Sequence, residues 1–152
     1  MQPKVVQSFD GLRLNFNQLT ELLSSDNYNS RFSGNCLNNF ILQSTVQILA
    51  VQNNKIFKDI MLKIVNEFNL YNIPLDIDLF VGFSQGSCSI IHDDPYDVLI
   101  YGLHGETIYI IDKKKYYVKP GDMIKINAGE IHQAISIEPR IILSIGIRND
   151  KK

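Results

Sequence analysis

The sequence has few of the features that mark membrane, secreted or nucleic-acid-binding proteins. Its 152 residues include two cysteines, Cys36 and Cys88, which lie far apart. No apolar run is long enough to span a bilayer, and the N-terminus lacks the form of a signal peptide. These absences predict a protein of a reducing, intracellular compartment, the cytoplasm, with no membrane partner.

An excess of charge is also missing. The chain has 15 basic and 16 acidic residues, for a formal net charge of −1. The basic residues are dispersed apart from the run 113–115, whose place between two apolar stretches is typical of an exposed hairpin tip. Without a basic patch, the sequence predicts no nucleic-acid partner.

What is present is a pattern of short strands. The length and the 45% of hydrophobic residues suit one domain over residues 1–152 with a sizeable core. From residue 75 onward, short apolar segments are separated by turn residues. The expected strands are 75–83, 88–92, 98–103, 107–111, 116–118, 123–126, 132–137 and 141–147. This pattern predicts a mainly β jelly-roll barrel core over 75–147, with a mouth at one end for a small ligand.

Residues 1–70 are expected to form an N-terminal α/β extension packed on the barrel. We predict a short hairpin from 5–9 and 12–16, then a helix capped by Asn17 and running to about residue 23. The segment 26–39 has loop composition and is a candidate lid, whereas 40–51 fits either a strand or a helix. Apolar residues at helical spacing predict an amphipathic helix over 54–70, with its apolar stripe on the outside of the barrel.

Histidine is scarce, yet two of the three histidines fall in two matched motifs. The first motif has the form GxxxxxHxD and runs from Gly86 to Asp94; the second has the form GxxxxxNxGxxH and runs from Gly121 to His132. His92 and Asp94 are two residues apart, so both can face the same side of an extended segment. His132 follows a strand and a turn that would return it to His92. Two imidazoles and one carboxylate are the ligands of the facial triad that holds non-haem Fe(II) with open positions, so the sequence predicts one divalent metal site.

These two segments resemble the two motifs of the cupin superfamily, although Asn127 replaces a common proline and the glutamate of the usual first motif has no match. The HxD form and the run HDDPYDV (92–98) resemble the JmjC-type branch of the 2-oxoglutarate oxygenases, and within it the ribosomal-protein hydroxylases. The resemblance covers residues 76–147, about half of the chain. It implies a double-stranded β-helix, Fe(II) as cofactor, 2-oxoglutarate as co-substrate, and hydroxylation of a C–H bond. The resemblance implies a protein side chain as substrate, but because the chain is short for the extra domains of those hydroxylases, we equally expect a small molecule or a short peptide.

One position departs from this family. JmjC-like enzymes hold the distal carboxylate of 2-oxoglutarate with a lysine or arginine at the position that Thr107 occupies here. An enclosed carboxylate needs a cation or several donors to offset its desolvation. We expect Arg140, at the start of the last strand, to supply the cation. Ser144, Ser89, Thr107 and Tyr101 are the expected additional cofactor-binding donors.

Two other classes of function fit the same residues. A metal cupin that does not use 2-oxoglutarate, such as a dioxygenase, an isomerase or a sugar-modifying enzyme, would explain Thr107 without Arg140. A non-catalytic cupin sensor or binding module would keep the barrel. Among the remaining polar residues, we expect Tyr96 at the mouth, Asp97 behind a ligand histidine and His104 at the surface or rim. A homodimer through sheet edges is also expected.

Overall fold

The structure, a computed structural model, describes residues 7–8, 14–24, 30–32, 45–83 and 89–148. Within these residues the strands are β1 (Gln7–Ser8), β2 (Ser30–Phe32), β3 (Thr45–Ile48), β4 (Leu75–Gly82), β5 (Asp97–His104), β6 (Thr107–Ile111), β7 (Lys114–Val118), β8 (Asp122–Ile126), β9 (His132–Ser136) and β10 (Arg140–Ile147). They form two antiparallel sheets. The large sheet has the order β1-β8-β5-β10-β4-β3-β2, and the small sheet has the order β7-β6-β9.

The strands β4 to β10 lie within two residues of the positions predicted from the alternating apolar pattern. Between β6 and β7 the chain turns through Asp112 and Lys113, which both have positive φ, as in a two-residue type I′ turn. The lysine run 113–115 is exposed at this tip, as expected. The chain therefore has the mainly β, two-sheet architecture of a jelly roll.

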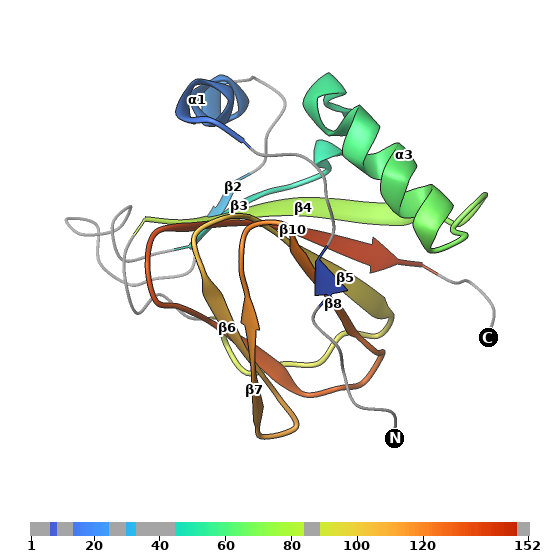
Figure 1. The fold of residues 1–152 in the computed structure, drawn as a ribbon, viewed down its shortest axis with the longest axis vertical. Helices are drawn as coiled ribbons and strands as arrows, with labels where there is room; N and C mark the ends of the chain where they lie inside the picture. Colours follow the sequence, from blue (N-terminus) through green and yellow to red (C-terminus); the bar gives the residue numbers. More distant parts are fainter. Residues whose placement is uncertain (1–6, 9–13, 25–29, 33–44, 84–88, 149–152) are drawn as a thin grey trace.

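The two faces of the large sheet are buried against different partners. On β10, Leu143 and Ile145 belong to an apolar core shared with Ile60 and Ile64 of helix α3 (Lys58–Glu67). Ile142 belongs instead to a second core between the two sheets, because side chains alternate along a strand. Figure 1 shows α1 and α3 on one side of the large sheet and β6 and β7 on the other. The barrel interior is therefore the side away from the helices.

Both predicted helices form, with different ends. Helix α1 (Phe16–Ser24) is capped by Asn15 and not by Asn17: Asn15 Oδ1 accepts from Gln18 N, Gln18 Oε1 accepts from Asn15 N, and both distances are 2.9 Å. This reciprocal pair is a capping box. Helix α3 is shorter than predicted, because the 3₁₀ turn η2 (Lys55–Phe57) takes the place of its first turn and the helix ends at Glu67; a further 3₁₀ turn, η1 (Val51–Asn53), lies before η2. In the part of the chain that the structure describes, no helix combines the length and apolarity needed to cross a membrane.

Two local predictions differ from the structure, and two segments left open are described only in part. Strand β1 pairs with β8, and Phe16 is already helical, so the hairpin does not form as predicted; residues 5–6, 9 and 12–13 lie outside the described residues. The segment 89–92 makes a single β-bridge at His92 instead of a regular strand; Cys88 lies outside the described residues. In the ambiguous stretch 40–51, residues 45–48 form β3. Of the candidate lid 26–39, residues 30–32 form β2 paired with β3, and the rest lies outside the described residues.

Candidate metal centre

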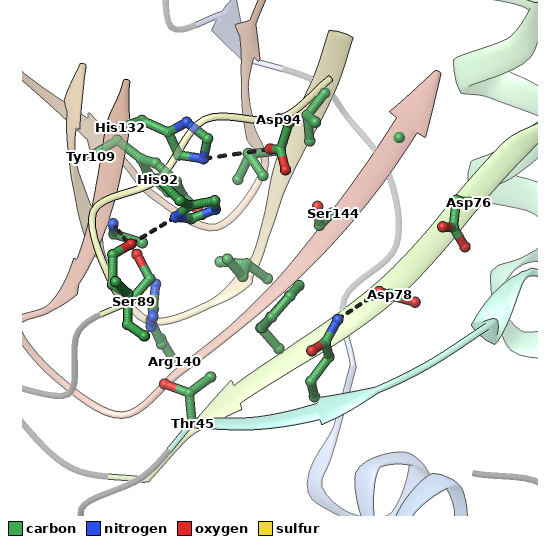
Figure 2. Close-up of a pocket in the computed structure, with 18 of the residues that line it drawn as sticks. Thr45, Asp76, Asp78, Ser89, His92, Asp94, Tyr109, His132, Arg140 and Ser144 are labelled. Carbon is green, nitrogen blue, oxygen red and sulfur yellow. Dashed lines mark hydrogen bonds and ion pairs between the residues drawn. The ribbon is translucent and has the colours of Figure 1, made fainter. Parts of the chain in front are cut away.

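The three predicted ligands meet at one point, with His92 exposed, Asp94 partly buried and His132 buried. One potential ligand atom from each of His92, Asp94 and His132 lies within 4.8 Å of the others. His132 Nε2 is 3.6 Å from Asp94 Oδ2, and the two imidazole centroids are 4.3 Å apart. Figure 2 shows the three side chains converging on one side of a cavity. The predicted triad is therefore brought together by the fold.

Backbone pairing places the two histidines opposite each other. His92 N donates to His132 O at 3.1 Å, and His132 N donates to His92 O at 2.8 Å. A further bond from Ser89 N to Ala134 O, at 2.9 Å, continues the pairing of this segment with β9. The segment before the HxD motif thus runs along the edge strand of the small sheet, which brings both imidazoles to the same place.

The orientation of each imidazole is set by a backbone carbonyl. His92 Nδ1 lies 2.6 Å from Ile90 O, and His132 Nδ1 lies 2.9 Å from Glu130 O. A carbonyl oxygen only accepts, so Nδ1 carries the proton in each ring and Nε2 is left with its lone pair. Metal-binding histidines are held by this kind of bond from the second nitrogen. The donor set therefore fits a divalent metal bound through two Nε2 atoms and the Asp94 carboxylate.

Asp97 does not take the role predicted for it behind a ligand histidine. Its Oδ1 accepts from Ala128 N at 2.9 Å, and its Oδ2 pairs with Lys125 Nζ at 2.6 Å. A second bond joins the same two segments, because Gly129 N donates to Asp94 O at 2.8 Å. Asp97 therefore fastens the segment that carries the first motif to the turn that precedes His132.

The triad lies in the wall of a cavity of about 660 Å³. Arg140, 2% exposed, lines the same cavity and approaches Tyr109. Burial raises the pKa of Tyr109 to about 12, although the Arg140 guanidinium acts in the opposite direction. Apolar side chains, among them Phe80 and Ile142, line the same cavity. The cavity thus combines a metal-ligand cluster with one buried cation and apolar surface.

Only some of the predicted cofactor-binding residues line the cavity. Arg140, Ser144 and Ser89 line the cavity as expected; the Ser89 hydroxyl accepts from Ala134 N at 2.9 Å. The prediction for Tyr101 was wrong: it is fully buried in the core under the helices, on the opposite face of β5. Thr107 was also wrong as a cavity residue, since it is fully buried in the small sheet and does not line the cavity.

Sequence reasoning missed Thr45 and Gln47 on β3 and Asp76 and Asp78 on β4, four polar residues of the cavity wall. Asp78 accepts from Gln47 Nε2 at 2.7 Å and from Ala50 N at 3.1 Å. Asp76 forms an ion pair with Arg148. Two aspartates two residues apart in an otherwise apolar strand did signal a polar inner face. Thr45 carried no such signal.

The predicted place of Tyr96 at the cavity mouth agrees with the structure. Its ring packs on Gly146, where an added Cβ would lie 2.6 Å from Tyr96 Cε2. The Arg148 guanidinium lies 5.4 Å from the ring centroid, within cation–π range. Burial raises the pKa of Tyr96. His104, in contrast, is exposed and outside the cavity.

Comparisons with known proteins agree on the fold. No protein-family model matches the sequence, and no curated protein matches it. Among solved structures, the chain is similar to YcfD, a ribosomal oxygenase from Escherichia coli, in complexes with cobalt and succinic acid (17% identity, TM-score 0.78, 98% of this chain and 49% of that chain) and with cobalt and 2-oxoglutarate (17%, 0.77, 99% and 49%). It is also similar to a cupin superfamily protein from Desulfitobacterium hafniense (19%, 0.51, 69% and 78%).

The chain spans about half the length of the oxygenase structures. At these identities the likeness concerns the fold. The convergent cluster of His92, Asp94 and His132 adds a feature of this chain itself, in the order His-x-Asp followed by His. This chain therefore has the double-stranded β-helix fold, with a ribosomal oxygenase and a cupin superfamily protein among its structural neighbours.

Proposed function

We propose that this protein is an Fe(II)- and 2-oxoglutarate-dependent oxygenase of the JmjC-like cupin type that hydroxylates a small molecule or a peptide. The observation that carries the proposal is the joint presence, in one cavity, of a two-histidine, one-carboxylate cluster and a buried arginine. This ligand set suits non-haem Fe(II) with open coordination positions. A structural neighbour solved with cobalt and 2-oxoglutarate supports the same pairing of metal and co-substrate.

Each group of the cavity has a separate task in this proposal. His92, Asp94 and His132 hold the metal, and the carbonyls behind the imidazoles keep both Nε2 atoms directed to it. Arg140 receives the distal carboxylate of 2-oxoglutarate, because a buried carboxylate needs a charge-assisted partner. Apolar side chains around Arg140 exclude water and strengthen that interaction.

Bound iron would supply the oxidative chemistry, in which 2-oxoglutarate and O₂ become succinate and CO₂ while one oxygen atom enters the substrate C–H bond. The remainder of the cavity, bounded by Tyr96 and the inner face of β4, offers room for the substrate. Ile90, 81% exposed beside this opening, gives the mouth an apolar edge. Such a mouth suits a small molecule or a short side chain inserted from outside.

The proposal is tested by thermal unfolding with Mn(II) under argon. We expect 2-oxoglutarate to raise the melting temperature only when the metal is present, since the ligand binds the folded, metal-loaded state. Arg140→Ala should retain Mn(II) and weaken 2-oxoglutarate by about 2–5 kcal/mol, because the carboxylate would lose its charged partner. A parent protein that binds Mn(II) but not 2-oxoglutarate would refute the co-substrate and leave a metal cupin of another activity.

The cytoplasmic location and the homodimer remain predictions. Among the described strands, β1 and β2 end the large sheet, and β7 and β9 end the small one, although the segment 89–92 already pairs with β9. Unpaired strand edges of this kind can pair with a second copy. Light scattering of the purified protein tests the dimer, and fractionation of cells tests the location.

A further inference from the structure

Thr45 has a buried hydroxyl group at the cavity, and the proposed function assigns it no role. Its Oγ1 is shielded from solvent and has no hydrogen-bond partner among the described residues, although Thr45 lines the cavity. Buried hydroxyl groups are normally paired, because desolvation without a hydrogen bond is unfavourable. A group of this kind in a cavity wall points to a ligand that supplies the missing partner.

The strand register places Thr45 and Arg140 in one row. Gly82 of β4 pairs with Thr45 of β3 on one side and with Arg140 of β10 on the other. Residues paired directly across antiparallel strands share a face, so both side chains project into the cavity. Their Cα atoms are about 10 Å apart, since adjacent strands lie about 4.8 Å apart. The glycine between them has no side chain to fill this space, and Figure 2 shows the labelled side chains at the same end of the cavity.

The chemistry of the pair favours an anion. A guanidinium donates hydrogen bonds and cannot accept them, so Arg140 cannot receive the Thr45 proton. A carboxylate placed over Gly82 can accept from both groups, from the guanidinium with charge assistance and from the hydroxyl. The aspartates on β4 do not serve as this acceptor, because Asp78 and Asp76 lie four and six residues along the strand from Gly82, about 13 and 20 Å away at about 3.3 Å per residue.

We propose that Thr45 Oγ1 donates a hydrogen bond to the carboxylate held by Arg140, so that β3 of the N-terminal extension completes the subsite for the distal carboxylate of 2-oxoglutarate. This inference rests on the proposed function. It assigns the hydroxyl that sequence reasoning sought at Thr107 to a different strand. In this subsite the Arg140 guanidinium provides the positive charge, and the Thr45 hydroxyl provides a hydrogen bond that orients the carboxylate.

The test compares Thr45→Val with Thr107→Val in the full chain loaded with Mn(II) under argon. Both substitutions remove a buried hydroxyl that has no hydrogen-bond partner within the described part of the chain, but of the two residues only Thr45 lines the cavity. Calorimetric titration with 2-oxoglutarate should show about tenfold to hundredfold weaker binding for Thr45→Val, the loss typical of one hydrogen bond to a charged group. Thr107→Val should bind as the parent does, and Thr45→Ser should restore most of the affinity.

A second ligand tests whether the effect of Thr45→Val depends on the distal carboxylate. 2-Oxovalerate has the 2-oxo acid group but no distal carboxylate, so its affinity for Thr45→Val should equal that for the parent. Equal weakening of both ligands would overturn the inference, because the substitution would then have disturbed the metal end. Unchanged 2-oxoglutarate binding by Thr45→Val, with binding lost in Arg140→Ala, would overturn the role of Thr45 and leave the oxygenase proposal standing. A parent that binds Mn(II) without 2-oxoglutarate would overturn both.

Discussion

Removal of the Asp97 carboxylate should weaken metal binding more than it weakens the fold. The Nδ1 atoms of both ligand histidines bond to backbone carbonyls and not to Asp97. Asp97 instead binds Ala128 N in the turn before His132 and starts the strand that follows Asp94. In Asp97→Ala the backbone bond from Gly129 N to Asp94 O would still join this turn to the first motif, but the side-chain bond from Asp97 would be lost. His92, Asp94 and His132 would then sample more conformations, which raises the entropic cost of bringing the three side chains around one metal ion.

The two effects differ in size. The Asp97–Lys125 pair joins side chains that are 29% and 48% exposed, and ion pairs with this much solvent contribute about 0–1 kcal/mol. Water can replace the carboxylate at Ala128 N, so the total loss in unfolding free energy should be about 1 kcal/mol. Groups that support metal ligands from behind, in contrast, typically change metal affinity by about 10- to 100-fold. We therefore expect a clear change in metal affinity in a protein that still folds.

The measurement is calorimetric titration of Mn(II) into the parent, Asp97→Ala and Asp93→Ala, with urea unfolding of each metal-free protein. Asp93 is an exposed aspartate between His92 and Asp94, so its removal takes the same charge from the neighbourhood without cutting a bond to the turn. We expect only Asp97→Ala to lose about 10-fold or more in affinity. Equal Mn(II) affinity in both variants would refute a positioning role for Asp97, because the charge alone would then account for the change.

Two further predictions concern the cavity. His92→Ala or His132→Ala should abolish Mn(II) retention in dialysis while the far-ultraviolet circular dichroism stays that of the parent, since the apolar strands build the core; retention by either variant would contradict the metal site. Burial raises the pKa of Tyr109 from 10.0 to about 12. The unfolded chain therefore loses the phenol proton at a lower pH than the folded chain does, and the stabilisation present below pH 10 is lost as the pH rises through 12. This loss amounts to about 3 kcal/mol, and Tyr109→Phe should remove it from the pH dependence of urea unfolding, whereas identical profiles for the two proteins would argue against it.

The sequence contained enough information for the barrel strands and the metal ligands. Strands such as β6, with its alternating buried residues, show the period of two that sequence reasoning uses. His92, Asp94 and His132 were found because two short motifs fix their spacing, and local turns then bring them together. Strand periodicity and motif spacing both depend on residues that are close in the sequence. They can therefore be recognised without knowledge of the strand register.

The face on which a residue lies was harder to predict where both faces of a strand are covered. On β5, residues 98–103 are all buried, because the helices cover one face and the small sheet covers the other. No alternation remains to show that Tyr101 faces the helices while Ile100 lines the cavity. Thr45 was missed for another reason: its place beside Arg140 depends on two strand pairings between distant segments.

The β-bridge between His92 and His132 has a consequence for how the barrel closes. The two residues face each other across the bridge, while strands β5 to β8 all lie between them along the chain. An ion bound by both imidazoles would act as a removable cross-link that closes the long loop between them. Its binding free energy would offset the entropic cost of closing that loop. The metal-free chain would have only a few backbone bonds at this corner, so opening there should be the first local unfolding event. Metal supply would then govern how rigid the mouth is as well as which chemistry it can perform.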